Sequence, residues 1–159
     1  MQNLNQTNAS AYGLTLLRIV IGIVFVMHGG QKLFVYGLEG TAGFMSQTGL
    51  PFPMLSAIAA ITAEFVGGLF LVAGAFTRWV TPPLAFTMVV AAVTVHLKGF
   101  FLPAGFEYTL VLFAASVALG LAGPGAFAVD NILARRRSEK TGQATSPAMQ
   151  RSVPHVEAA

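Results

Sequence analysis

Residues 54–76 read MLSAIAAITAEFVGGLFLVAGAF, an apolar run interrupted by a single carboxylate, Glu64. About 20 helical residues cross the roughly 30 Å hydrocarbon core of a bilayer, so this run is long enough to span a membrane. It lacks the continuous polar face that a helix on the surface of a soluble domain would need. The stretch therefore predicts a membrane-spanning helix, with lipid as its solvent.

The rest of the chain agrees with this interpretation. Of its 159 residues, 55% are hydrophobic and only 9% are charged, whereas about 25% are charged in an ordinary soluble domain. Three more apolar runs are present, and Pro or Gly residues lie at or near the boundaries of the four, with Pro82 and Pro83 in the first turn of the third. The sequence predicts an all-α polytopic membrane protein, a four-transmembrane-helix bundle with spans at about residues 12–33, 54–76, 80–97 and 105–123. The connection 34–53 is expected in the membrane interface, with a short helix around 41–47.

The distribution of Lys and Arg predicts the orientation of the bundle. Arg78 lies between the second and third runs, and five basic residues follow the fourth run: Arg135, Arg136, Arg137, Lys140 and Arg151. Cytoplasmic segments carry this excess, so both termini are predicted in the cytoplasm. Residues 1–10 carry no Lys or Arg, and no A-x-A site directly follows the first apolar run, so a cleaved signal peptide is not expected. Residues 1–134 are then one domain, and residues 135–159 form a disordered basic cytoplasmic tail.

Composition also excludes several functions. The chain has no Cys, which rules out its own disulfides, Fe–S clusters and thiolate-bound metals. Its net charge of +3 comes from the tail, which lacks aromatic residues to stack on bases. The predicted partner is therefore the lipid bilayer and not a nucleic acid.

Several ionisable side chains fall deep within the predicted spans, namely Arg18, His28, Glu64, His96 and Glu107. Burying such a group in a span costs about 2.5–3.5 kcal/mol unless it is paired or hydrated. At about 1.5 Å per residue, Arg18 lies about 9 Å and Glu64 about 18 Å from the inner boundary, and the other three lie near 24 Å. The sequence predicts an Arg18–Glu64 ion pair and a polar cluster in the outer half, with Lys32 and Lys98 at its rim.

This cluster has a structural and a functional interpretation. Buried ion pairs can fix helix packing, whereas histidines titrate near neutral pH and favour a ligand or proton site. Among ligands, a quinone headgroup hydrogen-bonded by His or Arg is favoured. A haem between His28 and His96 has no other supporting feature, and a metal site would need an E-x-x-H pair that the chain lacks. Catalytic residues stay unassigned.

Short motifs also recur in order between about residues 14 and 130. They are Leu17-Arg18, His28-Gly29, Lys32-Leu33-Phe34, Gly49-Leu50-Pro51-Phe52-Pro53, Glu64, Gly67-Gly68, Gly74, Thr77-Arg78, His96, Gly99-Phe100-Phe101, Gly105-Phe106-Glu107-Tyr108, Gly123-Pro124-Gly125 and Asp130. Together they resemble the DoxX family of small four-helix membrane proteins. That family often has Ser-Leu-Asp after Gly-Pro-Gly, where this chain has Ala128-Val129-Asp130, so only the Asp carries over.

The resemblance implies a protein of the bacterial inner (plasma) membrane. Named members of the family are membrane subunits of sulfur-compound:quinone oxidoreductases, or partners in oxidative-stress and thiol-redox complexes. We therefore expect a redox-linked membrane component that binds a quinone or small solute, as a subunit of a quinone-linked oxidoreductase. The alternative is a non-enzymatic scaffold or assembly partner of a redox or stress-response complex. A redox partner protein and a second copy of the chain are both open as partners, and a transporter would need the inverted repeat or broken helix that we do not find.

Overall fold

The computed structural model describes residues 4–101, 103 and 105–149, and every regular element among them is helical. This confirms the all-α prediction. The elements in chain order are α1 (Leu4–Gly30), the π-helix η1 (Gln31–Val35), α2 (Gly37–Gln47), α3 (Pro53–Ile61), the π-helix η2 (Thr62–Val66), α4 (Gly67–Ala73), α5 (Thr77–Thr94), α6 (Glu107–Ala122) and α7 (Val129–Met149).

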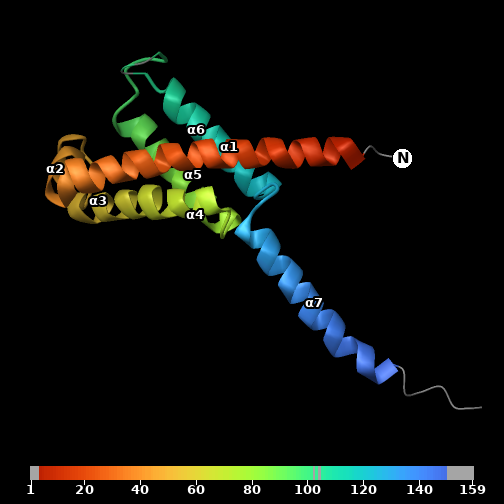
Figure 1. Ribbon diagram of the computed structural model, residues 1–159. Coiled ribbons are helices and arrows are strands. Elements are labelled where there is room, and N and C mark those ends of the chain that lie inside the picture. The colour runs from red at the N-terminus through yellow and green to blue at the C-terminus, as the bar shows by residue number, and fades with distance from the viewer. Residues whose placement is uncertain (1–3, 102, 104, 150–159) are drawn as a thin grey trace, which may run out of the picture.

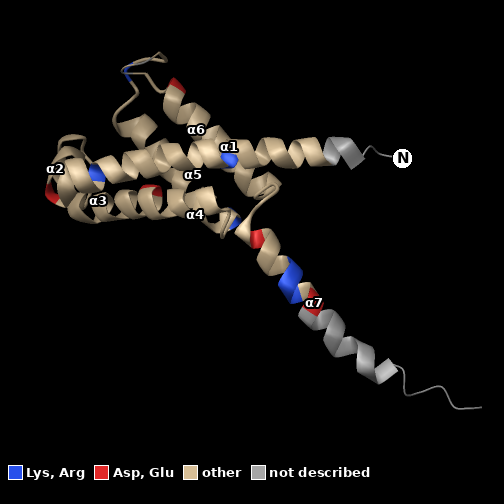
Figure 2. Cartoon of the chain, viewed as in Figure 1, with Lys and Arg blue, Asp and Glu red and all other residues tan. Residues whose placement is uncertain are grey.

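The helices form a bundle from which α7 projects (Figure 1). The rod α1–η1 lies beside the rod α3–η2–α4, and α5 and α6 pack on each other next to these two rods. Within the described residues, Asn8–Val35 and Pro53–Ala73 are long and apolar enough to cross a membrane, and α6 is a shorter apolar helix. The helix α5, with 18 residues, lies where the third span was predicted. Figure 2 shows few charged residues along the bundle.

Glycines bring the two rods into backbone contact. A Cβ on Gly22 would lie 2.9 Å from the backbone nitrogen of Val72, and one on Gly68 would lie 2.8 Å from that of Val26. A Cβ on Gly29 would lie 2.8 Å from the Cα atom of Phe65 and closer still to its backbone nitrogen. Small residues allow this approach where lipid provides no hydrophobic drive for helices to associate.

The helix α2 covers one end of the bundle, which we call the α2 end. The sequence predicted a short helix around residues 41–47, and this is confirmed with a longer range. Ala42 and Met45 of α2 pack with Ala57 of α3 in a small apolar cluster. The Thr41 hydroxyl donates a hydrogen bond to the Lys32 carbonyl oxygen at 3.1 Å, which ties α2 to η1.

Residues 123–131 close the opposite end, and we call this segment the C-terminal clasp and that end the clasp end. The Ala126 N–H donates to the Ala11 carbonyl oxygen at 3.1 Å, and the Thr15 hydroxyl donates to the Ala126 carbonyl oxygen at 2.8 Å. Gly125 has φ +75°, and a Cβ there would lie 2.6 Å from the Ala11 oxygen, so the contact with α1 requires glycine. The clasp thus ties the start of α7 to α1.

Asp130 of the clasp caps α5, a helix that makes no capping hydrogen bond from its own N-cap side chain. Its carboxylate accepts hydrogen bonds from the backbone N–H groups of Phe76 at 2.7 Å and Thr77 at 3.0 Å. Its own N–H donates to the Gly74 carbonyl oxygen at 3.0 Å. The carboxylate therefore satisfies two otherwise unpaired donors at a helix N-terminus and opposes the positive end of the helix dipole.

We expect Asp130→Ala to lower the free energy of unfolding by about 1–2 kcal/mol, the usual cost of removing a helix cap. The measurement is a detergent-denaturation titration of the purified chain followed by circular dichroism. Glu139→Ala is the matched control, because Glu139 is an exposed carboxylate on α7. Equal stability of the two variants would contradict the capping role.

The helix α7 differs from the sequence prediction. A disordered tail was expected from residue 135, whereas α7 continues as a helix to Met149. Ala, Arg, Glu and Lys are strong helix formers, so the segment can be helical without a core of its own. Its arginines, Arg135, Arg136 and Arg137, are exposed. The part of the predicted tail at residues 150–159 lies outside the described residues.

Candidate functional site

Each of the two π-helices contributes one member of a buried ion pair. Lys32 lies in η1 and Glu64 lies in η2, and the Lys32 ammonium Nζ donates to the Glu64 carboxylate oxygen Oε2. The Glu64 side chain is only 5% exposed and that of Lys32 is 25% exposed. π-Helical turns are rare in proteins overall, but those that do occur are often found at functional sites. Their coincidence with this pair marks it as the centre of the candidate site.

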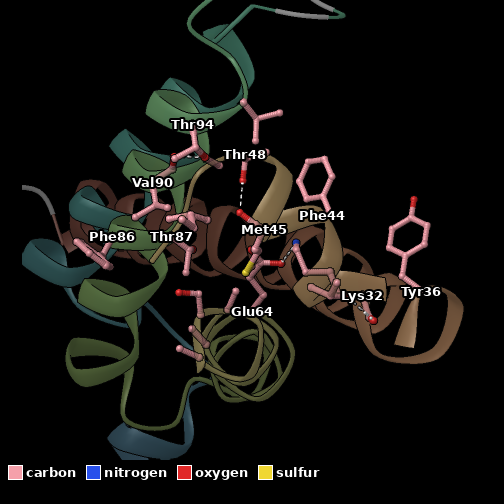
Figure 3. A pocket seen from close by; sticks show the side chains of 18 of the residues that line it. Lys32, Tyr36, Phe44, Met45, Thr48, Glu64, Phe86, Thr87, Val90 and Thr94 are labelled. Atoms are coloured by element: carbon pink, nitrogen blue, oxygen red, sulfur yellow. Dashed lines mark hydrogen bonds and ion pairs between the residues drawn. The ribbon is translucent and has the colours of Figure 1, made fainter. Parts of the chain in front are cut away.

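The pair lies at the edge of a cavity of about 760 Å³ under α2. Figure 3 shows Lys32 and Glu64 close to Met45, with Thr87 and Phe86 across the cavity on α5. Ala59, Ala60 and Ala63 line the α3–η2 side, and their small side chains leave the space open. The remaining lining residues are Gln31, Tyr36, Gly40, Thr41, Phe44, Thr48, Leu50, Pro51, Ser56, Pro83, Val90, Ala91, Thr94 and Val95.

Lys32 and Glu64 are the charged residues of this lining. The threonines on its walls use their hydroxyl protons locally: Thr87 donates to the Leu84 carbonyl oxygen at 2.8 Å, and Thr94 donates to that of Val90 at 2.8 Å. These hydroxyls keep acceptor capacity but have no free proton to donate. The cavity is consequently apolar with one charged edge, the form typical of a small-molecule site.

Phe44 and Phe86, which line the cavity, are also 51% and 67% exposed. The cavity therefore reaches the outer surface of the helix bundle between α2 and α5. An apolar molecule could enter by this route without crossing the packed core.

The predicted site residue His28 lies on α1 outside the cavity lining. Its side chain is exposed, and its ring atom Nδ1 lies 2.9 Å from the Val24 carbonyl oxygen. The ring centroid is 5.8 Å from that of Tyr108, and Glu64 acts electrostatically on the same tyrosine. His28 therefore packs against Tyr108, and its ring nitrogen Nδ1 is directed at the α1 backbone and not at the ion pair.

The other residues predicted in the outer half are also outside the cavity lining. His96 follows α5, is partly buried, and its ring atom Nδ1 has no hydrogen-bond partner. Glu107 is the first residue of α6 and is partly buried. Lys98 is exposed in the connection between α5 and α6.

The predicted Arg18–Glu64 ion pair is wrong. Arg18 is 1% exposed and points to the clasp end, where its Nη2 donates to the Phe127 carbonyl oxygen at 3.3 Å. A Cβ on Gly74 would overlap its Nη1, so glycine provides the space for the guanidinium. The Asp130 carboxylate acts on the guanidinium electrostatically but forms no direct ion pair with it. The arginine therefore contacts the clasp, and Glu64 has Lys32 as its partner.

Lys32 was predicted only as a rim residue. The outer position of the polar cluster predicted a site under the connection 34–53, but the apolar lining of the cavity under α2 was not predicted. The signal for Lys32 was its place three residues after Gly29, the glycine that allows α1 to approach η2 closely. The signal for the cavity was the alanine spacing on α3 and η2, at residues 59, 60 and 63. Neither pattern identifies a ligand without the three-dimensional contacts.

An apolar helical bundle with close glycine contacts between its helices is the architecture of a helical membrane protein, and this one contains an apolar cavity with a charged edge. The DoxX family model matches residues 13–97, and the chain belongs to the DoxX family. The "Putative oxidoreductase CatD" of Bacillus subtilis (strain 168) is 41% identical over 119 residues, which are 74% of this chain and 84% of that protein.

Two inner membrane proteins of Escherichia coli (strain K12) are also similar. YphA is 30% identical over 128 residues, 74% of this chain and 87% of that protein. YqjF is 31% identical over 129 residues, 78% of this chain and 94% of that protein. No solved structure matches the chain.

Proposed function

We propose that this chain is an inner-membrane, redox-linked component that binds a quinone in the cavity under α2. The bundle spans the membrane four times, with both termini in the cytoplasm and the α2 end outside. The oxidoreductase in the name of CatD and the inner-membrane location in the names of YphA and YqjF support this proposal. The excess of Arg at the clasp end supports the orientation.

The observation that carries the proposal is the apolar cavity with Lys32 and Glu64 as its charged edge. A quinone has a flat apolar ring, two carbonyl acceptors and a lipid-soluble tail. The Lys32 ammonium can donate a hydrogen bond to a carbonyl oxygen, and the Glu64 carboxylate can accept one from the hydroxyl of the reduced form. The exposed phenylalanines at the cavity opening provide a route for the tail towards lipid.

The test is thermal unfolding of the purified chain in neutral detergent, titrated with a short-chain ubiquinone and a short-chain menaquinone. A ligand at about 100 times its Kd stabilises the folded state by about 2.7 kcal/mol, so a saturable rise in Tm is expected. Ala59→Phe should remove this rise, because Ala59 lines the cavity and a phenyl ring there would fill it. Ala59 is exposed, so the larger side chain does not have to enter the packed core. Ala118→Phe, an equal enlargement at an exposed position of α6, should keep it. No rise with any quinone would contradict the proposal.

The roles of His28, His96 and Glu107 are a further part of this proposal. Their side chains would carry protons between the ion pair and the outer surface, with Tyr108 beside His28. The same titration on His28→Gln and His96→Gln tests this extension. A weaker quinone response in these variants would support it, and an unchanged response would restrict the site to Lys32 and Glu64.

The scaffold alternative is favoured by a different observation. Arg18 of α1 donates to the clasp and Asp130 of the clasp caps α5, so part of the buried charge holds the bundle together. A scaffold would co-purify with a stoichiometric partner and would not respond to quinones.

A further inference from the structure

A second hollow lies on the outside of the bundle, between α5 and α6 near the clasp end. It is a groove of about 290 Å³, distinct from the cavity under α2. It is lined by Arg78, Thr81, Pro82 and Ala85 of α5 and by Ser116, Val117, Gly120 and Leu121 of α6.

Small residues create this groove, and the two hydroxyl groups on its floor are already hydrogen-bonded within their own helices. A Cβ on Gly120 would lie 2.7 Å from the Thr81 hydroxyl oxygen, so glycine lets α6 approach α5 here. The Thr81 hydroxyl donates to the Thr77 carbonyl oxygen at 3.0 Å, and the Ser116 hydroxyl donates to that of Leu112 at 2.8 Å. Both hydroxyl protons are thus used within their own helices.

One end of the groove is cationic. Arg78 is exposed and forms no ion pair with another residue in the described part of the chain. Trp79, the next residue, is 80% exposed, and tryptophans of this kind lie at the headgroup level of membranes. Arg78 is therefore expected at phosphate depth, with Val117 and Ala85 deeper among acyl chains.

The charge on this side extends beyond Arg78. The hydrogen bond from Asp130 to Gly74 places the start of α7 beside the turn that leads into α5. Arg135 and Arg136 follow on α7 and are exposed. Arg78 is the basic residue of this group that lines the groove, and a basic residue near a membrane surface contributes about 1 kcal/mol to the binding of an anionic headgroup.

We propose that the α5–α6 groove binds one anionic phospholipid, with its phosphate at Arg78 and an acyl chain against Val117 and Leu121. This combination of a cationic end and an apolar length is complementary to a lipid of the phosphatidylglycerol type. A second copy of the chain is a poorer occupant, because copies inserted in the same orientation would bring like-charged arginines together at one depth. The proposal does not depend on the cavity under α2.

The experiment measures the Tm of the purified full chain in neutral detergent against added phosphatidylglycerol, or phosphatidylcholine with the same acyl chains. Phosphatidylglycerol is expected to raise the Tm with a saturable dependence, and phosphatidylcholine to have a much smaller effect. Arg78→Gln should weaken the apparent affinity about fivefold, which corresponds to about 1 kcal/mol. Arg135→Gln is the matched control, because it removes the same charge at the same end without lining the groove.

Two further measurements distinguish a bound lipid from a free anion and from a second copy of the chain. Inorganic phosphate at equal concentration should not raise the Tm, because it cannot occupy the apolar length of the groove. Val117→Trp, which fills the groove, should abolish the lipid effect, and Arg78→Gln tests the site independently if that variant does not fold. The proposal is overturned if Arg78→Gln and Arg135→Gln weaken the apparent lipid affinity equally, or if inorganic phosphate alone gives the full rise in Tm. It is also overturned if cross-linking joins the groove residues of two copies of the chain.

Discussion

Replacing Gly29 with alanine is expected to destabilise the bundle by about 2 kcal/mol or more, because the new methyl group would meet backbone and not a mobile side chain. The Cβ would lie 2.8 Å from the Cα atom of Phe65, in the middle of η2. Relief requires η2 to move away from α1. Glu64 precedes Phe65 in η2, so the same movement would separate the carboxylate from Lys32.

The control for this prediction is the adjacent glycine. A Cβ on Gly30 would lie 3.6 Å from the nearest ring carbon of Phe65, an ordinary van der Waals distance. Gly30→Ala should therefore fold normally and gain up to about 1 kcal/mol from the better helix propensity of alanine. Detergent-denaturation titrations of the two variants provide the measurement. Equal stability of the two variants would show that α1 and η2 are not in backbone contact.

The second large effect is expected from breaking the ion pair. Lys32→Met leaves the Glu64 carboxylate buried without its partner, which costs about 3–5 kcal/mol in comparable buried pairs. Lys98→Met is the control, because Lys98 is exposed and lies outside the cavity lining. If both single variants are equally stable, the pair does not contribute to the fold.

A double variant separates stability from function. Lys32→Met combined with Glu64→Met removes both charges and fills similar volume, a change that is often neutral for buried pairs. We expect its free energy of unfolding to return close to that of the natural chain. Its Tm should nevertheless no longer respond to quinone, because the hydrogen-bonding groups are gone. A restored fold that still binds quinone would remove Lys32 and Glu64 from the proposed site.

Most helical segments were predictable from the sequence, because long apolar runs separated by Pro and Gly leave few alternatives. Pro53–Ala73 and Asn8–Val35 lie where two spans were predicted. The α7 helix was not predicted, because its residues carry no apolar periodicity that requires packing. Charge and helix propensity alone do not distinguish a solvated helix from a disordered tail.

The candidate site was less predictable, and the partner of Glu64 shows why. Depth estimates that count residues along regular helices left Arg18 as the nearest long cation to Glu64. Arg18 points to the clasp because Gly74 leaves room for its guanidinium and the Phe127 carbonyl oxygen accepts a hydrogen bond from it. Both the turn at Gly74 and the clasp contain glycines with positive φ angles, which regular helix geometry does not represent. Lys32 reaches Glu64 through two π-helical turns, which a constant 100° per residue cannot represent.

The C-terminal clasp has a consequence for the order in which the chain assembles. It joins residue 126 to residue 11, and residue 130 to residues 74, 76 and 77. During synthesis, Arg18 of α1 is therefore enclosed only after the clasp, more than 100 residues further along the chain, has been made. A chain cut before the clasp would lack the Phe127 carbonyl oxygen that accepts from Arg18 and the Asp130 contact with Gly74, so α1 and α4 reach their final contacts only after α6 has been made.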